Sequence, residues 1–162
     1  MTVVTSAADI RFVAKGSGYY FASWRQVYVL DWRDGVTRES LDASVRGKAI
    51  VLRDYPKGVF VLNLMRTVAM PSAEIRAYAE KKQSEDVAGV LGHVTVIDAH
   101  GFMASAMRST IAGLYLVARS PFPRKVYATP DEAVKWIASV ASEPAAWSEQ
   151  LAVAIREIRE SV

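Results

Sequence analysis

The two histidines of the chain and the aspartate between them are the residues whose types and spacing could do chemistry. His93, Asp98 and His100 all fall within the stretch HVTVIDAHGF. Two imidazoles can hold a metal ion, and an aspartate beside a histidine can help that histidine to activate a nucleophile. Strand residues alternate between two faces, and these two histidines would be separated by roughly five or six residues at about 3.3 Å each. We therefore expect that they do not share a zinc ion.

A hydrolase would need a nucleophile close to Asp98 and His100. Ser105 and Ser109 follow them in the chain, but neither lies in the G-x-S-x-G motif that presents a catalytic serine. A turn or a helix cap accounts for Asp98 and His100 equally well, because aspartate readily bonds the backbone of the residues after it. We therefore predict no catalytic residue. Hydrolase chemistry at Asp98 and His100 stays open as an alternative, in which His100→Ala would abolish an activity without loss of stability.

Other signatures of metal or cofactor chemistry are missing from the sequence. It contains no cysteine, and neither a G-x-G-x-x-G nor a Walker-type phosphate-binding loop occurs. No EF-hand or H-E-x-x-H spacing is found. The paired carboxylates at 85–86 and 131–132 suit solvated helix ends. We predict a non-enzymatic protein with no metal and no cofactor.

The composition is that of one globular domain, with 162 residues of which 51% are hydrophobic and 23% charged. The net charge is +3, and the basic residues are scattered, with only doublets at 81–82 and 124–125. Nucleic-acid binders concentrate basic residues along one face or arm, so we expect no nucleic-acid partner. The first residues lack the basic start and apolar core of a signal peptide, and the longest strongly apolar stretch, 111–118, is far shorter than the roughly 20 residues of a spanning helix. We expect a cytoplasmic protein without a membrane span.

Hydrophobic periodicity and turn residues predict a series of strands and helices. Alternation in the early strands places Asp31 on the face opposite to Trp32. The segment TPDEAVKWI gives the sharpest helix start, with Thr129 as the cap, Pro130 as the first helical residue and Glu132 closing a capping box. The predicted strands are 10–14, one or two within 19–33, 58–65, 90–97 and 125–128, and the predicted helices are 37–51, 72–86, 101–119, 130–137 and one that starts at 144.

Strands that alternate with helices predict parallel pairs joined by right-handed crossovers, whereas the opening strands, joined by a short turn, should pair antiparallel. We therefore predict an α/β fold with a single mixed, mostly parallel central sheet, helices mainly on one face, an antiparallel N-terminal edge and an extra C-terminal helix. Residues 1–142 would form the α/β domain and residues 143–162 an amphipathic helix. The apolar stripe of this helix would pack on the same domain or form a homodimer contact. The stripe consists of Trp147, Leu151, Ile155 and Ile158.

The helix predicted over 101–119 is apolar on most of its circumference. The simpler interpretation is a central helix pressed onto the sheet. The alternative is a surface that receives an apolar ligand or a partner helix, with Met103 and Met107 as adaptable contacts.

Three segments carry a resemblance to a known family. They are VYVLDWRDGVT at 27–37, VFVLNL followed by AMPSAEI within 59–75, and RKVYATPDEAVKWI at 124–137. In the order of these segments, the chain resembles the STAS-like superfamily over roughly residues 20–140. This superfamily includes the sulfate-transporter and anti-sigma-factor-antagonist domains. The resemblance implies a mixed sheet with helices mostly on one side, and a regulatory role.

Ser72 occupies about the position at which the anti-sigma-factor antagonists of that superfamily are phosphorylated. Their loop carries an aspartate before the serine and a glycine after it, whereas this chain has Met70-Pro71-Ser72-Ala73. A phosphate on Ser72 would nevertheless sit at a helix N-terminus, which accepts negative charge. An unmodified helix cap is the simpler role for this serine.

A fold signature without a catalytic constellation predicts a non-enzymatic regulatory or protein-interaction domain. Its protein partner would dock near the loop 70–74 and the adjoining helix. The alternative is a small-molecule carrier that binds an apolar, lipid-like ligand under the helix 101–119. The candidate partner or ligand surface comprises Met70, Ser72, Glu74, Phe102, Met103 and Met107.

Overall fold

Strands and helices follow one another along the chain in the computed structural model, which describes residues 9–67, 70–117 and 119–162. Residues 1–8, to which the expectation about a signal peptide applies, and Ala118 of the predicted helix lie outside the described residues. The strands are β1 (Ile10–Gly16), β2 (Tyr19–Trp24), β3 (Val27–Trp32), β4 (Val59–Met65), β5 (Val90–Ile97) and β6 (Arg124–Tyr127). The helices are α1 (Arg38–Asp54), α2 (Ala73–Glu85), α3 (Phe102–Val117), α4 (Pro130–Val140) and α5 (Ala145–Glu160).

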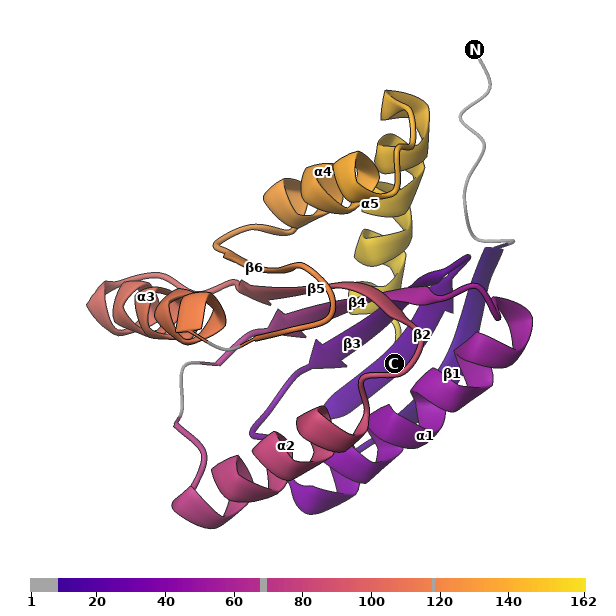
Figure 1. The fold of residues 1–162 in the computed structure, drawn as a ribbon. Helices are drawn as coiled ribbons and strands as arrows, with labels where there is room; N and C mark the ends of the chain where they lie inside the picture. Colours follow the sequence, from indigo (N-terminus) through magenta and orange to yellow (C-terminus); the bar gives the residue numbers. More distant parts are fainter. Residues whose placement is uncertain (1–8, 68–69, 118) are drawn as a thin grey trace.

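The six strands form one sheet in which spatial order follows chain order, from β1 at one edge to β6 at the other (Figure 1). β1, β2 and β3 pair antiparallel, and β3, β4, β5 and β6 pair parallel. The short turns between the first strands reverse the chain, whereas each later connection carries a helix and returns the chain in the same direction. The predicted mixed sheet with an antiparallel N-terminal edge is confirmed.

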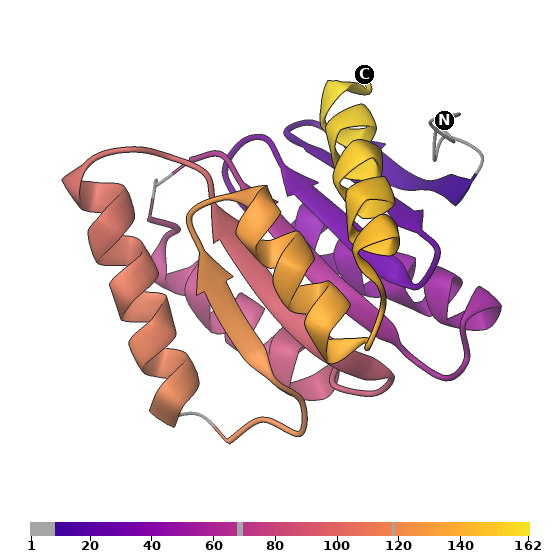
Figure 2. The same cartoon turned by 90° about the horizontal axis from the view of Figure 1, so that it is seen from above.

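Helices cover both faces of this sheet, with α1 and α2 on one side and α4 and α5 on the other (Figures 1 and 2). Alternation along the strands supplies an apolar core to each side: Leu62 lies in the core under α4 and α5, and its neighbour Val61 in the core under α1. We expected helices mainly on one face. The helices α1 and α2, which connect parallel strands, do share one side of the sheet. The helices α4 and α5 follow the last strand and cover the other side.

The C-terminal helix α5 packs on the sheet of its own chain, close to β2 and β3. Its apolar stripe is buried there, with Trp147 edge-on to Trp24 at a ring-centroid distance of 5.2 Å. Arg33 Nη2 donates to the carbonyl of Ile158 at 3.0 Å, and Arg66 Nη2 donates to the carbonyl of Arg159 at 3.0 Å. Two guanidinium groups therefore bind the carbonyls at the negative end of the helix dipole. A homodimer contact through α5 would have to use the opposite face of the helix.

The helix starts predicted from capping residues are present in the structure. Thr37 and Ser40 form a reciprocal capping box at the start of α1. At the start of α4 the Thr129 hydroxyl accepts from the backbone N–H of Glu132 at 3.3 Å and donates to the Glu132 carboxylate at 3.0 Å. The predicted cap is therefore present, but Glu132 does not close a capping box, in which its carboxylate would accept from the Thr129 backbone N–H. Both signals are local in sequence, which is why the residue types alone predict them.

Thr129→Ala is expected to lower the free energy of unfolding by about 1 kcal/mol, because it leaves a backbone N–H of the first turn of α4 without its side-chain acceptor. Urea unfolding followed by circular dichroism measures this. Ser139→Ala is the matched control, since Ser139 is exposed within the same helix and alanine is a better helix former. Equal losses in the two variants would show that the cap contributes nothing.

The helix α3 packs against the edge of the sheet at β6 and not over its centre, and this corrects the simpler expectation of a central helix. Only Ala104 of its residues is buried. Figure 2 shows α3 outside β6, at the end of the sheet farthest from β1. The crossover from β5 to β6 leaves the helix beside β6, which is only four residues long and is the last strand of the sheet. Among the described residues, no helix combines the length and the apolar character needed to cross a bilayer.

Candidate functional site

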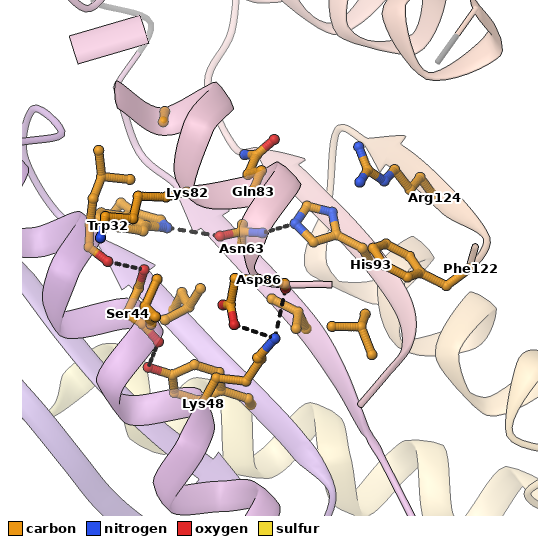
Figure 3. A pocket seen from close by; sticks show the side chains of 17 residues that line it. Trp32, Ser44, Lys48, Asn63, Lys82, Gln83, Asp86, His93, Phe122 and Arg124 are labelled. Atoms are coloured by element: carbon orange, nitrogen blue, oxygen red, sulfur yellow. Dashed lines mark hydrogen bonds and ion pairs between the residues drawn. The ribbon is translucent and has the colours of Figure 1, made fainter. Parts of the chain in front are cut away.

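A pocket of about 90 Å³ lies on the α1 and α2 side of the sheet (Figure 3). The strands supply its floor, α1 and the end of α2 supply one wall, and the segment leading into β6 supplies the other. Trp32, Asn63 and His93 come from β3, β4 and β5, neighbouring strands whose side chains face the same side. The labelled lining residues in Figure 3 are Trp32, Ser44, Lys48, Asn63, Lys82, Gln83, Asp86, His93, Phe122 and Arg124.

Trp32, Asn63 and His93 form a hydrogen-bonded row across the floor of this pocket (Figure 3). The Trp32 indole N–H donates to Asn63 Oδ1 at 3.0 Å, and Asn63 Nδ2 lies 3.0 Å from His93 Nε2. An indole N–H can only donate, so it fixes which end of the Asn63 amide is the oxygen. The Asn63 amide N–H then donates to His93 Nε2. A neutral His93 must therefore carry its proton on Nδ1.

His93 Nδ1 and Arg124 Nε are buried and have no hydrogen-bond partner within the described part of the chain. The two residues are register partners on β5 and β6. Burial, followed by the charge of Arg124, lowers the pKa of His93 from 6.5 to about 4, so the imidazole is neutral at pH 7. The Arg124 guanidinium lies over two rings, 4.9 Å from the centroid of Phe122 and 5.6 Å from that of Tyr115 on α3.

Lys48 of α1 holds the wall formed by the end of α2. Its buried ammonium donates to the carbonyl oxygens of Asp86 and Ala88 at 2.7 and 3.0 Å and lies 2.7 Å from the Asp86 carboxylate. All three N–H groups of the ammonium are therefore used. Helix α2 has no buried residue, and beyond this clamp polar contacts such as the bond from Tyr78 to Asp42 attach it to α1.

Asp98 and His100, the pair considered for hydrolase chemistry, do not come together. The Asp98 carboxylate pairs with Arg159 of α5 at 2.8 Å, and His100 is exposed in the turn before α3. His93 and His100 also do not share a site, because His93 lies in the pocket floor. Within the described ranges, no group of three or more potential metal ligands is found.

A second buried polar network lies where β3 and β4 end. Asp31 is fully buried, and its carboxylate accepts from Arg33 Nε and Arg66 Nη2, both at 2.9 Å. These are the two arginines that bind the last carbonyls of α5. The network therefore attaches the C-terminal helix to the sheet.

The residues of the predicted partner surface are mostly exposed and follow the carboxyl ends of β4 and β5. These strands are parallel neighbours, so the loops that follow them leave the sheet on the same side (Figure 2). Ser72 is exposed and caps α2, where its hydroxyl accepts from the backbone N–H of Ile75 at 3.2 Å. The simpler role predicted for Ser72, that of a helix cap, is therefore present, and the alternative role as a phosphorylation position stays untested. Met70, Glu74, Phe102 and Met103 are exposed, and Met107 is half-buried.

Residue types alone did not single out the pocket. The available signal was polar residues inside apolar strands: Asn63 interrupts the run VFVLNLM, and His93 lies in the buried strand 90–97. Their proximity to Trp32 depends on strand order and register, which the sequence does not specify directly. In the sequence Arg124 stands out as half of a basic doublet and not as a site residue.

No protein-family model, no curated protein and no solved structure matches this chain. The resemblance to the STAS-like superfamily therefore stays a prediction. What the chain binds has to be argued from its own surfaces and its own pocket.

Proposed function

We propose that this chain is a non-enzymatic regulatory domain of STAS-like type that binds an apolar helix of a protein partner along the exposed side of α3. The observation that carries the proposal is the exposure of large apolar side chains on this helix. Five of them are between 62% and 89% exposed. They are Phe102, Met103, Leu114, Leu116 and Val117.

Large apolar side chains that are exposed together on one helix mark an interaction site more often than they mark an ordinary protein surface. The one charged residue of α3, Arg108, does not interrupt it, because its guanidinium donates to the carbonyl oxygens of Ile97 and Ala99 at 3.0 and 3.1 Å. These bonds also hold the start of α3 at the end of β5. The outer side of the helix therefore offers a partner apolar groups and hydroxyls, without charge.

The composition of α3 favours a protein helix over a membrane surface or a nucleic acid. Helices that lie on membranes carry several lysines and arginines on their polar face, and α3 has none beyond Arg108. Nucleic acids also need basic residues at the contact. Small residues on α3 let another helix approach closely, and a Cβ placed on Gly113 would meet nothing within 4 Å. The space beside the helix is open for a partner.

Leu114→Glu is expected to weaken binding of this partner at least about tenfold, because the glutamate would have to lose water at an apolar contact. A photo-crosslinking amino acid at Val117, in cells that produce the chain, captures the partner, and mass spectrometry identifies it. We expect one discrete protein that differs from this chain. Its yield should fall when Leu114→Glu is added.

Val140→Glu is the matched control, since Val140 is 39% exposed on α4, which covers the other face of the sheet. The crosslinked product should persist in this variant. Light scattering should show that the purified chain is monomeric. A product that contains only second copies of this chain, a product that persists with Leu114→Glu, or binding of the chain to lipid vesicles through α3 would contradict the proposal.

The alternative function, a carrier of an apolar, lipid-like ligand under α3, needs an apolar cavity there. The pocket described above is small, and Lys48, His93 and Arg124 are among the residues that line it. These groups favour a polar ligand instead. Native mass spectrometry of the purified chain distinguishes the two, because a tightly held lipid adds its mass to that of the protein.

A further inference from the structure

We propose that the pocket between α1, α2 and β6 binds a small organic carboxylate, held by the Nδ1–H of His93 and the Nε–H of Arg124. This inference goes beyond the proposed function and does not depend on it. It rests on two buried donors that the described residues leave without an acceptor. Buried polar groups are nearly always hydrogen-bonded, so two orphaned donors side by side indicate that something else accepts from them.

The hydrogen-bonded row across the pocket floor fixes the chemistry that the ligand must have. Trp32 orients the Asn63 amide, and the amide donates to His93 Nε2. The remaining ring nitrogen of His93 is then a donor, as is Arg124 Nε, since a guanidinium cannot accept. Both groups require an oxygen or nitrogen with a free lone pair. A carboxylate offers two oxygens in one plane, one for each donor.

The two donors lie on neighbouring strands and face the same side of the sheet. His93 and Arg124 are register partners on the parallel strands β5 and β6, and neighbouring strands lie about 4.8 Å apart, so one small group between the two side chains can reach both. Figure 3 shows the ring nitrogen that does not bond Asn63 on the side of His93 towards Arg124. The adjacent Phe122 ring, with its centroid 6.4 Å from that of His93, closes this end of the pocket.

Charge in the pocket favours an anion. Three cations and one carboxylate line it, namely Lys48, Lys82, Arg124 and Asp86. The two lysines already have carboxylate partners, because Lys48 pairs with Asp86 and Lys82 pairs with Asp42. Arg124 forms no ion pair with any residue in the described ranges. A bound carboxylate would supply the missing counter-charge.

The size of the pocket restricts the ligand further. Its volume of about 90 Å³ is well below the roughly 300 Å³ at which pockets for drug-sized ligands begin. Tyr28, Trp32 and Phe122 contribute aromatic surface to the lining. A short or flat carboxylate of few atoms fits these dimensions better than a phosphate ester or a fatty acid.

The test is a titration of the full chain with acetate and with benzoate, observed through the imidazole nitrogens of His93 by NMR. We expect saturable shifts with at least one of the two acids at millimolar concentrations. The neutral amides acetamide and benzamide should produce none. The bound anion should also raise the pKa of His93, because it offsets the Arg124 charge that helps to hold that pKa low.

Arg124→Met should weaken carboxylate binding by about 10- to 100-fold, because it removes a charged donor and keeps the length of the side chain. Lys125→Met is the control: Lys125 is exposed, next to Arg124 on β6, and should bind the acid as the unaltered chain does. Should Arg124→Met unfold, Arg124→Lys replaces it, since lysine keeps the charge and lacks the Nε–H. The proposal is overturned if neither acid binds saturably, if the amides bind equally well, or if loss of the guanidinium leaves the affinity unchanged.

Discussion

Asp31→Asn is expected to lower the free energy of unfolding by about 3 kcal/mol and to loosen α5. The carboxylate is fully buried and accepts from Arg33 and Arg66, which also bind the last carbonyls of that helix. Removing one partner of a buried ion pair typically costs about 3–5 kcal/mol, since the remaining charge loses its counter-ion. The arginine side chains are 24% and 35% exposed, so water takes over part of their solvation and the lower end of that range applies.

Urea unfolding measures this loss, and hydrogen exchange of the α5 amides shows where it acts. Asp98→Asn is the control, because Asp98 also pairs with an arginine near the end of α5 but its side chain is 28% exposed. A pair accessible to water contributes about 1 kcal/mol or less. The exchange of α5 should accelerate in Asp31→Asn and change little in Asp98→Asn. Equal effects of the two variants would mean that the buried carboxylate does not secure the helix.

The sequence predicts those parts of the fold that depend on residues close to one another in the chain. The strand 90–97 matches β5 at both ends, and Thr129 caps α4 as its residue type indicates. The alternation that separates Asp31 from Trp32 is also confirmed, since Asp31 accepts from arginines that reach α5 while Trp32 lies in the core under α1. In each case the signal lies within a few consecutive residues and reflects one local backbone geometry.

Features that depend on distant segments were not predictable in the same way. An apolar helix such as α3 has the same composition whether a sheet or a partner protein covers it, and its place beyond β6 follows from the order of the strands. The row from Trp32 through Asn63 to His93 joins three strands whose register only the folded sheet reveals. Asp31 likewise gains one of its two partners, Arg66, from the loop after β4, and the α5 carbonyls that both arginines bind lie far along the chain.

Lowering the pH from 6.5 to 4 is expected to reduce the free energy of unfolding by about 3 kcal/mol through His93 alone. Burial and the charge of Arg124 lower the pKa of this imidazole in the folded chain from 6.5 to about 4. Protonating Nε2 would also break the hydrogen bond from Asn63. Below pH 6.5 the unfolded chain therefore takes up a proton that the folded chain refuses until about pH 4. The stabilisation that comes from the neutral His93 imidazole is fully present above pH 6.5 and is lost as the pH falls from 6.5 to about 4.

Urea unfolding at a series of pH values measures the loss, and variants separate His93 from the carboxyl groups that titrate at the lower end of the range. His93→Gln keeps an acceptor for Asn63 and cannot be protonated, so its stability should change less between pH 6.5 and 4 than that of the unaltered chain. His100→Gln removes the exposed histidine and should retain the full dependence. The charged groups around His93 disfavour its protonation. Arg124 repels a second positive charge, and the Asp86 carboxylate across the pocket is already bound by Lys48 and is not free to pair with an imidazolium. If His93→Gln and His100→Gln depend on pH equally, His93 does not carry the proton linkage, and the buried neutral imidazole inferred from its bond with Asn63 is wrong.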